Sequence, residues 1–208
     1  IFENFELDER LEWMRQFSYM LSQNGSIIIV EPAQKETCDT LQSISSLLSE
    51  QEELHIQAPY FNGKACPFLN AKNHFYSHEV RKIRSSNRVE KINGPLRLET
   101  HQVKFGLSIL SRRKPIVFPK NSSYCRMVSP MRKKKGTLSF IGIGGDGLEY
   151  MYEIQRRNLL TTEVKALTKL ERGDILKIQE GEKGKDHKRI RIPAFQSISC
   201  EFTTRWER

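Results

Sequence analysis

Clusters of lysine and arginine are the residues of this sequence whose type and spacing most directly predict chemistry. The chain of 208 residues has 34 lysine and arginine residues against 25 acids, which gives a net charge of +9. A basic excess of this kind favours a polyanion such as RNA or DNA as partner, with an ordinary solvated basic surface as the alternative. The residues that we predict to contact RNA phosphates are Arg112, Arg113, Lys114, Arg132, Lys133, Lys134, Lys135, Arg156 and Arg157.

Two of these clusters flank one expected β-hairpin over residues 137–154. We therefore expect Arg132–Lys135 and Arg156–Arg157 at the same end of it. Tyr150 and Tyr152 alternate along its second strand and share one face. Aromatic rings on such a face can stack on unpaired bases. The equal alternative is that both rings lie in a core.

Cys66, His74 and His78 are weak candidates for a metal site. Their C-x7-H-x3-H spacing combines a thiolate with two histidines one helical turn apart, and both residue types bind zinc. A second ligand pair at the spacing of a metal finger is absent, so we favour a buried cysteine and two surface histidines. The four cysteines form no C-x-x-C pair, which predicts free thiols in a reducing compartment.

No pattern predicts acid–base or nucleophilic catalysis, and the five histidines lie outside any recognisable catalytic context. Gly142-Ile-Gly-Gly-Asp-Gly147 matches the glycine pattern of dinucleotide-binding loops, but that pattern needs a helix after it. The following residues alternate as a strand, and Asp-Gly is a hairpin-turn signal, so we interpret the match as a turn. The sequence assigns no catalytic residue.

The first part of the chain has the pattern of an α/β sheet. Apolar spacing predicts helices over residues 8–22 and 37–48, and strands over 26–30, 54–58 and 103–110. The first strand is a β-branched run, typical of a strand buried on both faces. Residues 59–100 form an irregular excursion, in which 80–83 are predicted as part of a helix. This order is that of the closing half of a doubly wound sheet, whose last strand often returns antiparallel.

A composition break over residues 111–130 predicts a boundary between two domains, 1–114 and 115–208. In the second domain we expect the hairpin, a short helix over 161–169 and strands over 174–178 and 188–192. This pattern indicates a small β-rich domain similar to an oligonucleotide-binding barrel. An α/β unit only about 20 residues into the chain also indicates that the sequence begins within a domain. No apolar run approaches the ~20 residues of a membrane helix, so we predict no membrane partner.

Three stretches, in this order, resemble the ribosomal small-subunit methyltransferase-like family. Ile27-Ile-Ile-Val-Glu-Pro32 is similar to that family's apolar strand ending in Glu-Pro. Gln57-Ala-Pro-Tyr-Phe-Asn-Gly-Lys-Ala-Cys-Pro67, followed by His74-Phe75, resembles its cysteine-rich excursion. Ser129-Pro-Met-Arg-Lys-Lys-Lys-Gly136, then Asp146-Gly147 and Gly173-Asp174, resembles its basic β-rich tail. The likeness covers most of the chain from residue 1 to about residue 178.

The resemblance implies a class I, Rossmann-like methyltransferase fold, of which residues 1–114 would be the C-terminal half. It places the residues that bind S-adenosylmethionine before residue 1, in a full-length protein. It also implies a four-cysteine iron–sulfur site, whose positions fall on Cys66, Tyr60, Asn73 and Ile143. Because thiolates hold such clusters, we predict that the iron–sulfur cluster is absent.

We therefore predict a monomeric, methyltransferase-like protein that binds rRNA of the small ribosomal subunit, in ribosome assembly or translation. The resemblance implies the cytoplasm if the source is bacterial and the mitochondrion if it is eukaryotic. One alternative is an active S-adenosylmethionine-dependent rRNA methyltransferase. The other is a metal-binding protein that uses Cys66, His74 and His78.

Overall fold

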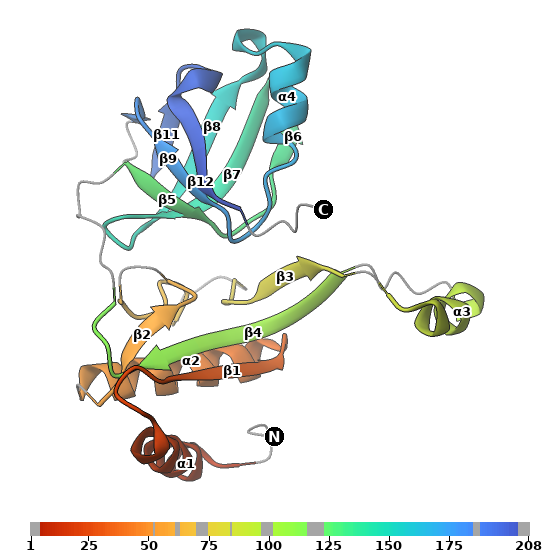
Figure 1. The fold of residues 1–208 in the computed structure, drawn as a ribbon. Coiled ribbons are helices and arrows are strands. Elements are labelled where there is room, and N and C mark those ends of the chain that lie inside the picture. The colour runs from red at the N-terminus through yellow and green to blue at the C-terminus, as the bar shows by residue number, and fades with distance from the viewer. Residues whose placement is uncertain are drawn as a thin grey trace. The chain divides into compact units, whose positions relative to one another are not determined.

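The computed structural model describes residues 5–51, 53–60, 63–69, 75–83, 85–96, 102–115, 123–184 and 188–203. The chain is mixed α/β and divides into two compact units (Figure 1). The first unit comprises Ile1–Pro59 and Phe68–Lys114, and the second comprises Tyr60–Pro67 and Pro115–Arg208. The short segment 60–67 therefore belongs with the second unit. Among the described helices none is both long and apolar enough to cross a membrane.

The first unit has the expected helix–strand order at its start. Its elements are α1 (Leu7–Met20), β1 (Ser26–Pro32), α2 (Lys35–Glu50), β2 (His55–Ala58), β3 (Glu79–Lys82), α3 (Asn87–Leu96) and β4 (Gln102–Ser111). The predictions for α1, β1, α2, β2 and β4 are confirmed. The prediction of a helix over residues 80–83 is wrong, because β3 pairs with the first residues of β4 there. The excursion also contains α3, which the sequence pattern does not predict.

β4 is the central strand of the first unit's sheet. It pairs antiparallel with β1 on one side and antiparallel with β2 and β3 on the other. β1 and β2 therefore run parallel to each other, with the last strand of the unit inserted between them. The expected antiparallel return of this last strand is confirmed.

Helices cover one face of β1 and leave the other open. Ile29 is buried, whereas its neighbours Ile28 and Val30 are 65% and 59% exposed. Apolar side chains from α1, α2, β1, β2 and β4, and one just before β2, form the core on the covered face: Met14, Ile29, Leu41, Ile44, Leu48, Leu54, Ile56 and Leu110. The prediction that β1 is buried on both faces is therefore wrong. A β-branched run has no polar face, so it does not distinguish a strand covered once from a strand covered twice.

Small residues let α2 lie close to β4. A Cβ atom at Gly106 would lie 3.0 Å from the sulfur of Cys38, tighter than ordinary contact. Two residues further along β4, the hydroxyls of Ser45 and Ser108 form a buried hydrogen bond of 2.7 Å. The side-chain amide of Gln42 donates to the carbonyl oxygen of Leu107 over 3.1 Å. These bonds satisfy buried polar groups at the helix–sheet contact.

The second unit is built almost entirely of short strands. Its elements are β5 (Tyr124–Met127), β6 (Arg132–Lys134), β7 (Thr137–Gly144), β8 (Glu149–Gln155), the 3-10 turn Arg156–Asn158, α4 (Thr161–Leu167), β9 (Ile175–Ile178), β10 (Glu182–Lys183), β11 (Arg189–Ile192), the 3-10 turn Phe195–Ser197 and β12 (Ile198–Phe202). The predicted hairpin, helix and strands are confirmed as β7, β8, α4, β9 and β11. β5, β6, β10 and β12 are additional.

The sheet of the second unit is curled into a half-barrel. Its strand order is β10-β11-β8-β7-β5-β9-β12, with β6 paired to β7. β11 and β12 lie five strand spacings apart in this order, about 24 Å in a flat sheet. The link between them, residues 193–197, would reach at most about 20 Å if fully extended. Part of the link is a 3-10 turn, which shortens its reach further, so the sheet must curl to bring β12 close to β11.

The inside of the half-barrel holds the second core. It includes Met127, Leu138, Ile154 and Leu176, each no more than 2% exposed. Tyr152 stacks on Phe140, with ring centroids 4.9 Å apart and planes 8° apart. Tyr150 and Tyr152 are both buried members of this core, so the alternative that places both rings in a core is confirmed.

The single covered face of β1 leads to a test of the first unit. Replacing Ile29 by Ala is expected to lower the free energy of unfolding by about 2–5 kcal/mol, because the substitution opens a cavity in the core. Replacing the adjacent Ile28 by Ala is expected to cost less than about 1 kcal/mol, since that side chain faces away from the helices. Urea unfolding followed by circular dichroism measures both. Equal losses would contradict a sheet covered on one face.

Candidate nucleic-acid interface

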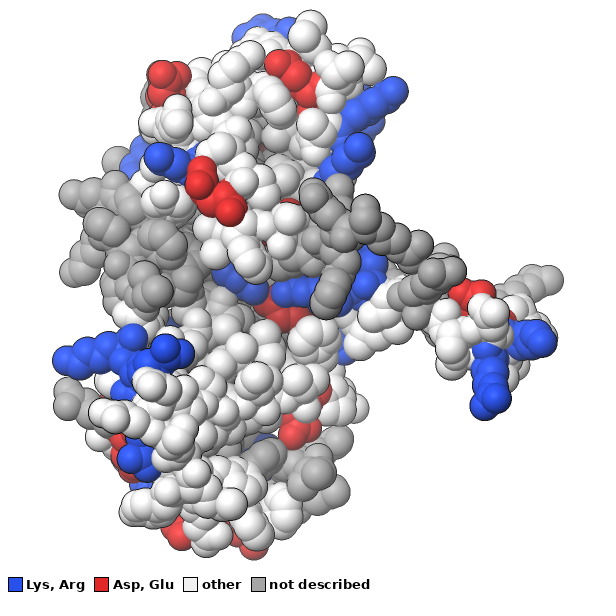
Figure 2. Space-filling view, viewed as in Figure 1, with Lys and Arg blue, Asp and Glu red and all other residues white. Residues whose placement is uncertain are grey.

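Two predicted basic clusters meet at one end of the β7–β8 hairpin. Gly136 has a φ of +82° and turns the chain between β6 and β7. The backbone N–H of Arg156 donates to the carbonyl oxygen of Gly136 over 2.9 Å, which joins the end of β8 to that turn. The cations gathered there are all exposed, and we call them the basic ridge: Arg132, Lys133, Lys134, Lys135, Arg156 and Arg157. Figure 2 shows lysine and arginine gathered where Figure 1 places β6.

The third predicted cluster, Arg112–Lys114, belongs to the first unit and is also exposed. The guanidinium of Arg112 donates to the carbonyl oxygen of Ser18 over 2.7 Å. Ser18 lies in the last turn of α1, and its carbonyl oxygen also accepts the backbone N–H of the C-cap residue Leu21 over 3.1 Å. The structure therefore gives Arg112 a contact that fixes the end of α1 beside β4.

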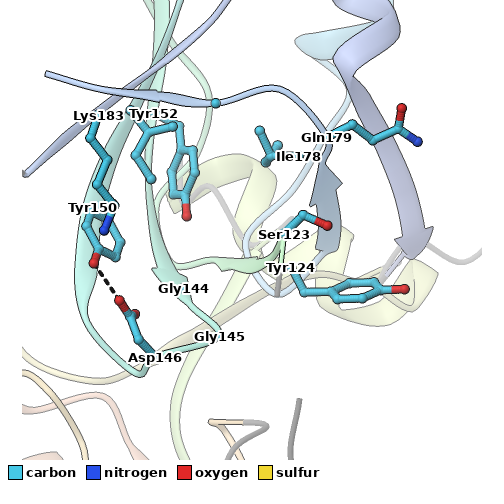
Figure 3. Close-up of a pocket in the computed structure, with 12 residues that line it drawn as sticks. Ser123, Tyr124, Gly144, Gly145, Asp146, Tyr150, Tyr152, Ile178, Gln179 and Lys183 are labelled. Atoms are coloured by element: carbon cyan, nitrogen blue, oxygen red, sulfur yellow. Dashed lines mark hydrogen bonds between the residues drawn. The ribbon is translucent and has the colours of Figure 1, made fainter. Parts of the chain in front are cut away.

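At the other end of the same hairpin lies a pocket of about 550 Å³ (Figure 3). We call it the mouth pocket. It is within the size range of small-molecule sites. The start of β5, the β7–β8 turn, β8 and the chain from β9 to β11 supply its lining residues: Ser123, Tyr124, Gly144, Gly145, Asp146, Tyr150, Tyr152, Ile178, Gln179, Gly181, Lys183 and Ile190.

Asp146 is held in place by its own turn. One carboxylate oxygen accepts the backbone N–H of Leu148 over 3.0 Å, and the other accepts the hydroxyl of Tyr150 over 2.5 Å. A Cβ atom at Gly144 would lie 2.9 Å from the Asp146 carboxylate and 3.1 Å from the Tyr150 ring, so a bare backbone is needed there. Burial, and then the hydrogen bond and charge of Asp146, raise the pKa of Tyr150 to about 12. Tyr150 is therefore neutral and donates at physiological pH.

Lysines from three separate segments contact residues that line the mouth pocket, and Lys183 itself lines it. The Lys183 ammonium lies 5.4 Å from the centroid of the Tyr150 ring. The ammonium of Lys64 donates to the backbone oxygen of Asp146 over 2.7 Å, and Lys177 lies 5.9 Å from the centroid of the Tyr124 ring. Cations over aromatic faces are favourable pairs that also leave positive charge near the surface.

Beneath the pocket, Tyr152 and Cys125 form a buried pair without catalytic character. Burial raises the pKa of Cys125 to about 12, and a hydrogen bond from Tyr152 opposes this only in part. Burial and the proximity of Cys125 likewise raise the pKa of Tyr152. Both groups are neutral at physiological pH, and a neutral buried thiol is a poor nucleophile.

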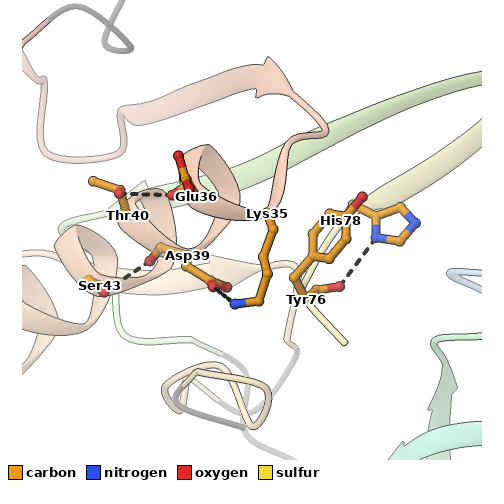
Figure 4. A network of polar contacts seen from close by, with 7 residues as sticks. All are labelled: Lys35, Glu36, Asp39, Thr40, Ser43, Tyr76 and His78. Carbon is orange, nitrogen blue, oxygen red and sulfur yellow. Dashed lines mark hydrogen bonds and ion pairs between the residues drawn. The ribbon is translucent and has the colours of Figure 1, made fainter. Parts of the chain in front are cut away.

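The structure divides the metal candidates between the two units. His78 lies in the first unit, where its ring packs 4.7 Å from that of Tyr76 and its Nδ1 atom lies 3.2 Å from the Tyr76 carbonyl oxygen (Figure 4). Cys66 is buried in the second unit. His74 lies outside the described residues. Among the residues that the structure does describe, no group of three or more candidate ligands could hold a metal ion.

The positions that the resemblance assigns to an iron–sulfur site supply one thiol, Cys66, and the absence of a cluster stays a prediction. The hydroxyl of Tyr60 lies 3.3 Å from the sulfur of Cys66, and both residues are buried. A hydrogen-bonded phenol fills the space beside the one thiol, and the third position, Ile143, is a buried aliphatic residue in β7. Asn73 lies outside the described residues. Cluster irons need thiolate ligands, which these side chains do not provide.

Comparison with known proteins found neither a matching family model nor a matching curated protein.

The sequence pattern identifies the basic ridge but not the mouth pocket. The ridge consists of runs of charge that lie close together in the sequence. Lys64 and Lys177, in contrast, are single cations far from the hairpin along the chain. The Asp-Gly turn signal and the alternation of Tyr150 and Tyr152 place these residues in the hairpin, yet they do not indicate which other segments face it.

The burial of three of the four cysteines predicts their reactivity. In the native protein at pH 8, iodoacetamide is expected to modify Cys200 alone, because Cys38, Cys66 and Cys125 are buried. In urea all four are expected to react. Mass spectrometry of proteolytic peptides locates the label. Rapid labelling of Cys66 in the native protein would contradict its burial against Tyr60.

The raised pKa values predict a loss of stability in alkali. The folded second unit favours the neutral forms of Cys125, Tyr150 and Tyr152, whereas the unfolded chain ionises at ordinary pKa values. Their contribution is complete below about pH 8 and is lost as the pH rises towards the folded-state values. Urea unfolding midpoints should therefore fall between about pH 8 and 11. The Cys125→Ala variant should show a shallower fall, and a midpoint independent of pH would contradict the prediction.

Proposed function

We propose that this protein binds rRNA of the small ribosomal subunit and acts mainly through that binding. One observation carries the proposal: the β7–β8 hairpin has the basic ridge at one end and a pocket with aromatic and lysine side chains at the other. The seven steps from Thr137 to Gly144 span about 24 Å along the strand. An RNA strand along the hairpin would therefore reach both ends, with phosphates on the ridge and a base at the mouth.

The strand order of the second unit supports single-stranded RNA as ligand. β5 pairs with both β7 and β9, β8 pairs in parallel with β11, and α4 lies between β8 and β9 in the chain. Oligonucleotide-binding barrels are partly open, curled sheets of five strands, and the second unit shares the curl but has eight strands. We therefore assign the second unit to that class of fold as part of the proposal.

Three features of the structure support the resemblance to the small-subunit methyltransferase-like family. The last strand of the first unit lies antiparallel between two parallel strands, as expected for the end of a doubly wound sheet. The open face of β1, with Ile28 and Val30, is consistent with a larger sheet in which further elements cover it. The contact of Tyr60 with Cys66 also joins two positions that the resemblance groups together.

The same sheet favours a second candidate, an S-adenosylmethionine-dependent rRNA methyltransferase. In this hypothesis the cofactor residues lie in the part of a full-length protein before residue 1, and this chain supplies the sheet's closing strands and the RNA-binding unit. Transfer of a labelled methyl group to small-subunit rRNA tests it with the full-length protein. Binding of the rRNA without any methyl transfer would reject the methyltransferase hypothesis and retain only the binding function. The metal-binding hypothesis fails if purified protein carries less than one equivalent of zinc or iron.

Binding to ribosomal subunits is the direct test of the proposed function. The chain is expected to bind small subunits in preference to large subunits, with an affinity that falls steeply between about 50 and 200 mM salt because phosphate contacts release counterions. Co-sedimentation over a salt series measures both. Equal weak binding to the two subunits would mean that the basic surface is only a general polyanion patch.

The basic ridge can be tested separately by charge removal. Replacing Arg132 and Lys133 by Ala should weaken binding and lower the slope of log affinity against log salt by about 1 for each phosphate that no longer meets a cation. Replacing Arg88 and Lys91 of α3 by Ala removes the same charge from the first unit and serves as the matched control. If both pairs of substitutions weakened RNA binding equally, the assignment of the basic ridge to the RNA interface would be wrong.

A further inference from the structure

The mouth pocket has the walls of a site for a flat, partly polar group. Figure 3 shows the rings of Tyr150 and Tyr152 on one side and Ser123, Ile178 and Gln179 on the other. Both tyrosines are neutral members of the core, and only the small exposed part of each, 6% for Tyr150 and 4% for Tyr152, is available to the pocket. A nucleobase has apolar faces and a polar edge, and such walls suit its faces.

Asp146 provides a fixed acceptor at the edge of this pocket. Each of its carboxylate oxygens already accepts one hydrogen bond from within the hairpin, from Leu148 and from Tyr150. A carboxylate has about four lone-pair sites, so each oxygen retains capacity for one further donor. The two existing bonds set the orientation of the carboxylate before any ligand arrives. A preorganised acceptor of this kind selects ligands that present two adjacent N–H donors.

Lys183 provides the charge for a phosphate. Its ammonium lies over the ring of Tyr150, on the same side of the pocket as the Asp146–Tyr150 hydrogen bond (Figure 3). Lys64 adds a second cation at the backbone of Asp146. Nucleotides carry a polar base edge and an anionic phosphate, and this pocket has an acceptor and cations to match both.

We propose that the mouth pocket binds one unpaired guanine nucleotide of RNA, with the N1–H and N2–H groups of the base donating to Asp146 and its phosphate on Lys183. This inference rests on the proposed RNA-binding function and gives it a base preference. Guanine presents two donors side by side on its pairing edge. Adenine, cytosine and uracil present only one donor group there, so they would leave one Asp146 oxygen without this bond.

The RNA ligand itself provides the first test and requires no protein variant. Fluorescence anisotropy would compare the full 208-residue chain with three labelled octamers: all uridine, one central guanosine, and one central inosine. Inosine keeps N1–H but lacks the N2 amine. The guanosine octamer is expected to bind about tenfold more tightly than the uridine octamer, as for a good bidentate contact, and inosine should lose most of that gain. Equal binding of all three octamers would overturn the proposal.

A matched pair of variants provides the second test. Asp146→Asn keeps the size of the side chain but replaces one acceptor oxygen by a donor, so the ratio of guanosine to uridine affinity should fall to about 1. Glu149→Gln makes the same chemical change three residues away on the exposed side of β8, and should keep the wild-type ratio. Retention of the guanosine preference by Asp146→Asn would overturn the proposal.

The outcomes separate this inference from the proposed function. Salt-sensitive binding of all octamers and of small subunits, without a guanosine preference, would remove the guanine site and leave RNA binding intact. Absence of binding to any octamer and to small subunits would overturn both. A guanosine preference without preference for small subunits would keep the pocket and reject the ribosomal assignment.

Discussion

The short link between β11 and β12 is the constraint on which the second unit depends. Because five residues must connect β12, at one edge of the sheet, to β11, the strand next to the other edge, the sheet has to curl. The curl creates an interior that apolar side chains fill. At the open end of this interior the side chains leave a pocket. Tyr124, Asp146 and Lys183 lie far apart in the chain but share that open end, because strand pairing places β5 beside β7, β8 beside β11 and β11 beside β10. The mouth pocket is thus a consequence of topology.

Two glycines at that open end leave space for the side chains that line the pocket. At Gly144 a side chain would collide with both Asp146 and Tyr150, and at Gly181 it would lie 2.7 Å from Ile190. The bare backbone lets the turn fold back on itself, so that the Asp146 carboxylate bonds within the hairpin. A longer side chain at either glycine would therefore disturb the pocket without touching the distant basic ridge. The two ends of the hairpin are consequently separable by mutation.

Sequence patterns predict most of the elements because long periodic segments carry strong signals. They fail where the signal is short or contradictory. β10 has two residues, and β5 contains a cysteine and an arginine that are both buried, so neither shows simple alternation. α3 contains Asn93-Gly94-Pro95, which predicts a turn, although the helix continues to Leu96. The ridge could be predicted because its charges are contiguous, whereas the pocket depends on contacts such as that of Lys64 with Asp146, which are separated by 82 residues.

Because the ridge and the pocket lie at opposite ends of one hairpin, they would contribute separately to the free energy of binding RNA. Contacts of exposed cations with phosphate are screened by salt and carry no sequence information. Contacts inside a partly enclosed pocket are screened less and depend on donor geometry. In the proposed function, the ridge would hold an RNA strand through its phosphates, and the pocket would determine which nucleotide is bound there. Raising the salt concentration should then weaken binding to every sequence while the ratio between sequences changes little, because the two contributions arise from different residues.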